Sequence, residues 1–287
     1  RAFDGLVMAG GLDSFKNVHR AQYYQLDEKG VTFIERAIKY GNKFQENKNS
    51  AQISMFGEAS EIQFPEPEIP EAQKWGVMEE LSKEKELVGI YISGHPLDDF
   101  KTEINYFCNT PLTVFQNEKE LMGKDLAVGG IITNIEHRVS KNGKGWASFS
   151  LEDYSGSHEF RLFSEEYLKF RHFLVPNAFI YAKIFCRKGW KDDVRFTFGS
   201  IQLLQDILEE FSKKITLNLS IKDINEANIE KLNTILSNFK GTKNLNFTVF
   251  DTEENLKLNL PSRSYKVDIS NELIEVLNKE QIHFKLN

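Results

Sequence analysis

Cations and aromatic side chains gather around two predicted turns in the middle of the chain. One turn carries Lys141 and Lys144, and the other carries Lys188 and Lys191. Lysine and arginine bind phosphates, and aromatic rings stack on bases, so this combination is typical of single-strand binding. The candidate binding residues are Arg138, Lys141, Lys144, Trp146, Lys183, Arg187, Lys188, Trp190, Lys191 and Arg195.

Some of these residues also have a purely structural interpretation. Phe149 and Phe185 could stack on bases, but we favour the interpretation that they fill a core. The lysines could be solvated loop tips. Trp190 stands between Lys188 and Lys191, where a core position is hard to explain. The sequence therefore leaves open how many of these side chains face a ligand.

The elements that must position these residues follow a recognisable order. Alternating apolar residues predict strands at 126–135, 146–151, 157–163, 178–185 and 194–204, with a helix at 165–174. Three strands, one helix and two strands is the order of an OB-fold barrel. That fold commonly binds single-stranded nucleic acid or oligosaccharide on one face.

Composition limits the other possibilities. A chain of 287 residues predicts two or three domains, and a net charge of −6 means that a nucleic-acid surface must be local. Cys108 and Cys186 lack a CxxC context and are expected to be free thiols in a reducing cytoplasm. No apolar run approaches ~20 residues, which predicts no membrane span. Because the sequence starts at Arg1 without a signal peptide, we expect a cytoplasmic fragment of a longer protein.

The segments before the barrel are predicted to be mostly helical. Residues 2–15 suggest the last turns of a helical domain, and 19–40 a helix that Gly41 ends. Further helices are expected at 71–91 and 97–107. His95 lies in the break between them, and we interpret it as a turn residue because no second ligand-type residue stands beside it.

A short apolar motif, Gln52-Ile-Ser-Met-Phe56, stands between polar residues and an acidic, proline-rich stretch at 58–71. Apolar side chains in such a linker need a cover. Either Met55 and Phe56 fill a groove on a partner while Gln52 makes polar contacts, or the motif packs back on the helical domain. The pattern alone leaves both open.

The last 82 or so residues predict a small α+β unit. Strands are expected at 214–221, 245–250, 256–260, 265–269 and 281–286, with helices at 224–239 and 271–278. A glycine-rich phosphate loop is missing from this segment, which indicates a protein-interaction module.

Four blocks of sequence resemble the C-terminal region of the bacterial replicative DNA polymerase III alpha subunit family. They are Leu6-Val-Met-Ala-Gly-Gly-Leu-Asp13, Gln52-Ile-Ser-Met-Phe-Gly57, Glu84-Lys-Glu-Leu-Val-Gly-Ile-Tyr-Ile-Ser-Gly-His-Pro-Leu-Asp98 and Lys144-Gly-Trp-Ala-Ser-Phe-Ser-Leu-Glu-Asp-Tyr-Ser-Gly156. The block from Glu84 to Asp98 is the most specific. The resemblance covers essentially the whole chain and is weakest after Asp206.

The resemblance implies a multidomain chain with five parts. Residues 1–50 would end a helix-hairpin-helix DNA-binding domain, and 51–72 would be a flexible linker that docks on the sliding clamp (beta) through Gln52, Ile53, Ser54, Met55 and Phe56. Residues 73–120 would be a helical connector, 121–205 the OB domain that meets the single-stranded DNA template, and 206–287 the domain that binds the tau subunit of the clamp loader. Gln281 to Phe284 resembles a second clamp motif, but we interpret it as the final strand.

The resemblance also implies that this chain does not catalyse. The parent protein would be a DNA-directed DNA polymerase, a nucleotidyltransferase of DNA replication, whose palm and Mg²⁺-binding aspartates would precede Arg1. The sequence offers no closely spaced aspartates for two Mg²⁺ ions, so we expect no catalytic residue, metal or cofactor here. The alternative is a stand-alone OB-fold protein that binds single-stranded nucleic acid and no clamp.

Overall fold

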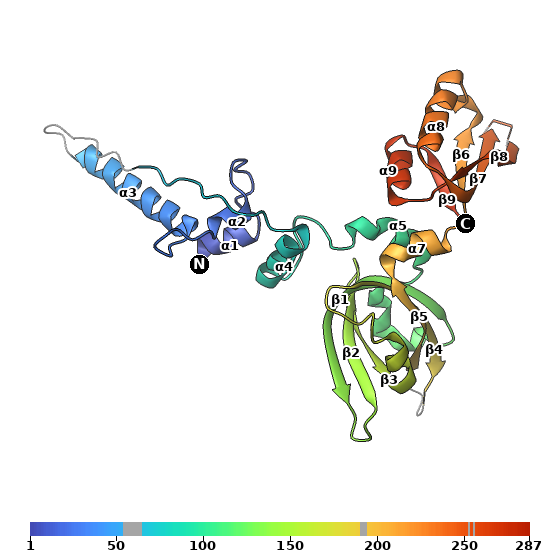
Figure 1. The fold of residues 1–287 in the computed structure, drawn as a ribbon, viewed down its shortest axis with the longest axis horizontal. Coiled ribbons are helices and arrows are strands. Elements are labelled where there is room, and N and C mark those ends of the chain that lie inside the picture. Colours follow the sequence, from blue (N-terminus) through green and yellow to red (C-terminus); the bar gives the residue numbers. More distant parts are fainter. Residues whose placement is uncertain (54–64, 190–193, 252, 255) are drawn as a thin grey trace. The chain divides into compact units, whose positions relative to one another are not determined.

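The computed structural model describes residues 1–53, 65–189, 194–251, 253–254 and 256–287, with backbone alone at 48–53. The chain divides into two compact units, Arg1–Pro96 and Leu97–Asn287 (Figure 1). Within the described residues, no helix is both long and apolar enough to cross a membrane.

The first unit is helical. Its helices are α1 (Ala2–Met8), α2 (Arg20–Tyr23), α3 (Phe33–Ile53) and α4 (Val77–Val88). A small core of Val7, Tyr23, Phe33 and Ile34 joins the first three.

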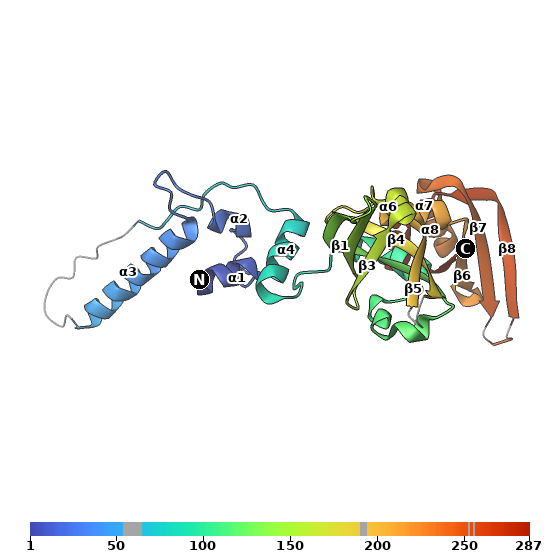
Figure 2. The ribbon, with the colours of Figure 1, turned by 90° about the horizontal axis from the view of Figure 1, so that it is seen from below.

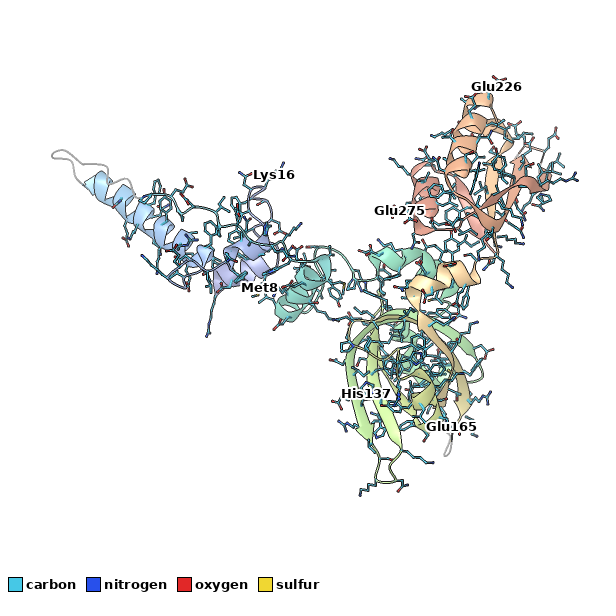
Figure 3. All side chains as sticks on the ribbon, in the orientation of Figure 1. Met8, Lys16, His137, Glu165, Glu226 and Glu275 are labelled. Atoms are coloured by element: carbon cyan, nitrogen blue, oxygen red, sulfur yellow. The ribbon has the colours of Figure 1, made fainter. Side chains whose placement is uncertain are left out.

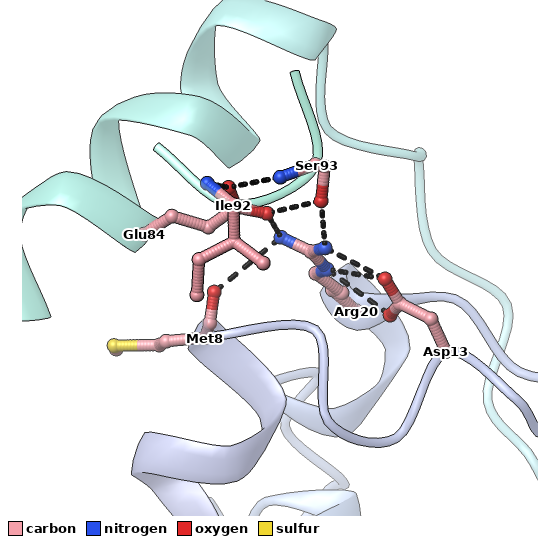
Figure 4. Close-up of polar contacts among 6 residues, drawn as sticks. All are labelled: Met8, Asp13, Arg20, Glu84, Ile92 and Ser93. Carbon is pink, nitrogen blue, oxygen red and sulfur yellow. Dashed lines mark hydrogen bonds and ion pairs between the residues drawn. The ribbon is translucent and has the colours of Figure 1, made fainter. Parts of the chain in front are cut away.

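A buried polar network supplements this small core (Figure 4). Arg20 donates to Oε1 of Glu84 at 2.7 Å and to Oδ2 of Asp13 at 2.6 Å. The amides of Ile92 and Ser93 donate to Oε2 of Glu84 at 2.8 and 2.9 Å. The Ser93 hydroxyl accepts a hydrogen bond from Arg20 and donates one to Oε1 of Glu84. The network therefore ties α4 and the segment after it to α2 and the turn before it.

The prediction that a helix runs from 19 to 40 and ends at Gly41 is wrong. α2 stops at Tyr23, a turn with a Leu26–Thr32 bridge follows, and α3 continues through Gly41 to Ile53. A glycine inside a helix costs only about 1 kcal/mol, and the residues after it include good helix formers. The polar composition of 41–51 therefore did not prevent a helix.

The second unit begins with the predicted barrel. Its elements are β1 (Asp125–Val139), β2 (Gly145–Glu152), β3 (Ser157–Phe163), α6 (Ser164–Phe170), β4 (Phe179–Lys188) and β5 (Val194–Leu203). The strands curve into a barrel (Figure 2), with the order β3-β2-β1-β4-β5 and antiparallel pairing throughout. The central β1, paired with β2 and β4, and the helix after β3 give the connectivity of an OB-fold. The predicted order of elements is confirmed.

Alternation along the strands fills the barrel. Phe149, Phe160 and Leu162 are fully buried, and η2 (Leu112–Leu121) closes the core with Phe115. Phe149 is thus a core residue, as predicted. The half-buried Phe185 lies outside this cluster and against Gly199, where an added Cβ would come within 2.4 Å of its ring.

Short helices flank the barrel. They are η1 (Asp98–Phe100), α5 (Lys101–Phe107) and α7 (Leu204–Phe211). Leu97, Tyr181, Leu204 and Ile207 form their common core. Helix α7 was not predicted, because its apolar residues continue directly from those of β5.

The remaining residues form the predicted α+β domain. Its elements are β6 (Lys214–Ser220), η3 (Ile221–Asp223), α8 (Glu226–Asn238), β7 (Lys240–Asp251), β8 (Leu256–Val267), α9 (Asn271–Lys279) and β9 (His283–Leu286). The strand order is β8-β7-β6-β9, with β6 and β7 parallel. Figure 1 shows α8 and α9 beside this sheet, where Leu236 and Leu277 pack on Ile215 and Leu217.

Two details of this domain differ from the prediction. The strands expected at 256–260 and 265–269 are one strand, β8, which runs through Pro261. Proline is tolerated there because β8 lies at the edge of the sheet, and the register shifts near it. The last strand begins at His283 rather than Gln281, whose φ of 57° places it in the preceding turn.

Candidate nucleic-acid interface

Rows of side chains cross β1, β2 and β3 on the outside of the barrel. Ala147, Phe149 and Leu151 point into the core, so the residues between them point outward. The strand register aligns these outward residues in rows, which are Arg138–Trp146–Phe163, Glu136–Ser148–Arg161 and Asn134–Ser150–Glu159. We call these nine residues the β1–β3 outer face.

A pocket of about 470 Å³ lies on this face. Its lining residues are Asn134, Ile135, Glu136, Arg138, Trp146, Ser148, Phe149, Ser150, Glu159 and Arg161. The lining combines an aromatic ring, hydroxyls, an amide and charges of both signs. In OB-folds, the side formed by the second and third strands is the side that binds oligonucleotides and oligosaccharides.

The first row is an aromatic pair with a cation. The Trp146 and Phe163 rings are stacked with centroids 5.7 Å apart, and Phe163 is 52% exposed. The Arg138 guanidinium carbon lies 5.5 Å from the Trp146 centroid. An exposed ring beside a guanidinium can contact a base and the phosphate next to it.

Each arginine of this face has a carboxylate two residues before it. Arg138 forms an ion pair with Glu136, and Arg161 binds Oε1 of Glu159 through Nη2 at 2.8 Å and Nε at 3.1 Å. Residues two apart in a strand share a face, which accounts for both pairs. His137, between Glu136 and Arg138, instead contacts the Tyr167 hydroxyl of α6 at 3.2 Å (Figure 3).

The predicted lysines Lys141 and Lys144 lie in the exposed turn between β1 and β2. The backbone amide of Lys144 donates to the Ser140 hydroxyl at 3.1 Å. Gly143, at a φ of 72°, supplies the left-handed conformation that the turn requires. The turn follows directly after Arg138, so its cations continue from the first row.

Among the described residues, the other predicted cations are Lys183, Arg187, Lys188 and Arg195, which lie on β4 and β5 outside the lining of this pocket. Arg187 and Arg195 are opposite each other in the register, and Lys188 is opposite Val194. Lys183 places its ammonium 4.9 Å from the Phe211 ring centroid of α7. The structure therefore separates the predicted set into a β1–β3 group and a β4–β5 group.

Several predicted residues cannot be placed. Trp190 and Lys191 lie outside the described residues, as do Ser54, Met55 and Phe56 of the apolar motif. Gln52 and Ile53 form the end of α3, where the structure gives only the backbone.

Arg161, Phe163, Ser148 and Ser150 also lie on the β1–β3 outer face and were not among the predicted residues. Their signal was the alternation of β3, in which Glu159, Arg161 and Phe163 occupy the outward positions. Strand boundaries alone do not reveal that β3 pairs with β2 opposite Trp146.

His158 lies in an aromatic cluster of the barrel. Burial lowers the pKa of His158, which lies among the rings of Phe115, Phe160 and Phe196. The part of the chain that the structure describes contains no cluster of three His, Cys, Asp or Glu side chains suited to a metal ion.

Comparison with known proteins gives consistent matches. Residues 215–287 match the family described as DNA polymerase III alpha subunit, C-terminal domain. The DNA polymerase III subunit alpha of Pseudomonas fluorescens is 22% identical over 298 residues, which covers 98% of this chain and 24% of that protein. The same subunit of Treponema pallidum is 31% identical over 173 residues, covering 60% of this chain and 14% of that protein. The chain spans about a quarter or less of the length of these relatives.

A mitochondrial single-stranded DNA binding protein of S. cerevisiae overlaps 28% of this chain and 95% of its own, with 14% identity and a TM-score of 0.23. Because the TM-score is so low, this match gives no support for the fold beyond the strand connectivity described above. The sequence matches, by contrast, confirm the resemblance found in the motifs. The chain is thus similar over most of its length to DNA polymerase III alpha subunits, and its residues 215–287 match their C-terminal domain.

Proposed function

We propose that the chain is a non-catalytic, DNA- and partner-binding part of a replicative polymerase, and that its β1–β3 outer face binds single-stranded DNA. The observation that carries the proposal is the row of Arg138, Trp146 and Phe163 beside the pocket. The lysines of the adjoining turn extend this row with further positive charge. Similarity to the alpha subunit family supports DNA as the ligand in preference to an oligosaccharide.

The binding should be weak and independent of sequence. Stacking contributes about 1–3 kcal/mol for each base and tolerates every base. Phosphate contacts release counterions, so affinity should fall as salt rises. A chain with a net charge of −6 has only local positive surfaces, which limits the number of phosphates bound.

Fluorescence anisotropy of a labelled oligonucleotide tests this proposal on the full chain. Arg138→Ala and Trp146→Ala should each weaken binding by about fivefold or more at low salt. Arg187→Ala with Arg195→Ala is the matched control for a surface elsewhere on the barrel, and should have the smaller effect. The proposal fails if wild type shows no binding at 50 mM salt, or if the β1–β3 variants bind as wild type does.

Lys141→Ala with Lys188→Ala tests the two turns. If phosphates run along the turn lysines, the double variant should lose affinity and show a shallower salt dependence. The single variants Lys141→Ala and Lys188→Ala then show which of the two turns contributes to DNA binding. Equal salt slopes in all variants would exclude the turns from the binding surface.

We also propose that Gln52 to Phe56 docks on the sliding clamp. The support is the isolated apolar motif itself and its resemblance to the family's internal clamp motif. Micromolar binding corresponds to about −8 kcal/mol, which a Met-Phe plug with a Gln anchor can supply. Met55→Ala with Phe56→Ala should abolish capture of the clamp in a pull-down. A chain that lacks 50–57 and still binds equally well would place the site elsewhere.

The family further suggests roles for the two ends of the chain. We propose that the α+β domain binds the tau subunit of the clamp loader, supported by the family match at residues 215–287. The end of a helix-hairpin-helix domain before residue 51 stays a prediction. A stand-alone single-strand-binding protein is the alternative, and a clamp pull-down distinguishes the two: the alternative predicts oligonucleotide binding with no clamp bound.

A further inference from the structure

Charges of opposite sign alternate over the β1–β3 outer face. Glu136 and Arg138 are two apart on β1, and Glu159 and Arg161 are two apart on β3. The register also puts Glu136 and Arg161 in one row, with Ser148 between them. Each guanidinium therefore has a carboxylate along its own strand, and the pocket wall carries balanced charge.

The carboxylates occupy the positions that a phosphate would use. Glu159 holds Arg161 through both Nε and Nη2, which is the edge of the guanidinium that grips phosphate in a bidentate pair. Glu136 holds Nη2 of Arg138, while the same guanidinium lies over the Trp146 ring. Single-stranded DNA that enters the pocket must displace both carboxylates before its phosphates can pair with these arginines.

The pairs are exposed enough to be displaced. The side chains of Arg138 and Glu136 are 57% and 59% exposed, and those of Arg161 and Glu159 are 62% and 52% exposed. Exposed pairs of this kind are weak. They are therefore suited to reduce affinity by a modest factor without closing the site.

We propose that Glu136 and Glu159 act as built-in competitors of the DNA phosphates and set a low affinity for the single strand. The inference rests on the proposed function of this face and names the residues that regulate it. Single-stranded DNA held in this way dissociates and rebinds rapidly, because Glu136 and Glu159 pair with the arginines again whenever a phosphate leaves. Both glutamates line the pocket and pair with its arginines, so they can tune affinity from within the site.

The test measures single-strand affinity by anisotropy for Glu136→Gln, Glu159→Gln and the double variant of the full chain. Glutamine keeps the shape of each side chain and removes the competing charge. Each substitution should tighten binding by up to about fivefold and the double variant by about tenfold at 50 mM salt. The gain should shrink at 0.5 M salt, where screening weakens the field around the freed arginines.

The matched control is Glu226→Gln with Glu275→Gln, which makes the same change in net charge on the exposed surface of α8 and α9 (Figure 3). This control should change affinity by less than about twofold, because exposed charges beyond a Debye length are screened. Thermal unfolding of every variant checks that the barrel is intact.

The outcomes separate this inference from the function on which it rests. If wild type binds and Arg138→Ala weakens binding, but the Glu136/Glu159 double variant binds no more tightly than the Glu226/Glu275 control, the competition is refuted and the interface stands. If wild type binds and the Glu136/Glu159 double variant binds more tightly while the Glu226/Glu275 control does not, the competition is supported. If neither wild type nor the double variant binds, both the interface and the competition are refuted.

Discussion

The guanidinium of Arg20 donates a 2.7 Å hydrogen bond to Oε1 of Glu84, which lies 64 residues further along the chain. Both side chains are almost fully buried. The other carboxylate oxygen, Oε2, accepts hydrogen bonds from the backbone amides of Ile92 and Ser93, so both oxygens of Glu84 have donors. In a unit with a small apolar core, this pair fixes where α4 packs.

Removing either partner should destabilise the first unit strongly. Glu84→Ala removes one of the two carboxylates that pair with the buried Arg20, as well as the acceptor of the Ile92 and Ser93 amides. Breaking a buried ion pair in this way typically costs about 3–5 kcal/mol. Urea unfolding followed by the fluorescence of Trp75, which stacks on Tyr24, reports on this unit. Glu86→Ala changes an exposed glutamate on the same helix and should stay within about 0.5 kcal/mol of wild type. Equal midpoints for the two variants would show that the pair contributes nothing.

The same carboxylate should make the unit sensitive to acid. Burial opposes the ionisation of Glu84, but hydrogen bonds from Ser93, Ile92 and Arg20 lower its pKa to about 2. Because the folded pKa lies below the unfolded value, the stabilisation is complete above about pH 4.5 and is lost as the pH falls toward 2. The difference in unfolding free energy between wild type and Glu84→Gln should shrink over that range. A difference that stays constant from pH 5 to pH 2.5 would contradict this assignment.

Glu103 should have the opposite pH dependence. Burial raises its pKa, and its Oε1 accepts a hydrogen bond from Asn271 at 3.1 Å. Its Oε2 has no hydrogen-bond partner among the residues that the structure describes. A carboxyl with a raised folded pKa stabilises most when protonated, below its unfolded pKa near ~4.3, and loses this contribution as the pH rises. Glu103→Gln should therefore raise the melting temperature at pH 7 and have little effect near pH 4. Glu275→Gln, on the exposed side of α9, is the control and should change neither value.

Gly41→Ala should stabilise α3. The position is helical, and an added Cβ would meet no atom within 4 Å. Alanine in place of an interior glycine contributes about 0.5–1 kcal/mol, so circular dichroism at 222 nm should show more helix. Gly89→Ala is the contrasting change: Gly89 ends α4 at a φ of 86°, so alanine there should destabilise. A loss of helix signal in Gly41→Ala would mean that the helix ends near Gly41 in solution.

Trp146 should report directly on the proposed interface. A base that stacks on its ring should quench its fluorescence, and Phe163 beside it should strengthen the effect. Trp146→Phe should remove most of the quenching that an oligonucleotide causes, while Trp75→Phe should leave the quenching unchanged. Quenching that survives in Trp146→Phe would place the strand elsewhere.

Local patterns were sufficient to predict the barrel but not its interface. The alternation of 146–151 and 157–163 gave both strands and their inward faces, including Phe149. Which outward residues meet depends on register, and register is set by contacts across the strands rather than within them. The spacing puts Arg161 and Glu159 on the same face of their strand, but only the register puts Arg161 opposite Ser148 and in one row with Glu136.

The misplaced boundaries have a similar cause. α7 continues the apolar run of β5 at Leu204, and only packing against α5 and Tyr181 makes it helical. Pro261 separates two predicted strands that the sheet joins, because an edge strand does not need that missing amide. In both places tertiary contacts decide between conformations that the local sequence permits.

The alternation of β2 and β3 also separates two sets of residues that are under different constraints. Ala147, Phe149 and Leu151 are constrained by the volume of the barrel interior, whereas the side chains of Trp146, Ser148 and Ser150 are not part of the buried core cluster. The outward set can therefore be exchanged as a block while the interior stays the same. Substituting every second residue of these strands could therefore change which ligand the barrel binds while leaving its core unchanged. Natural substitutions at the same outward positions could have the same effect.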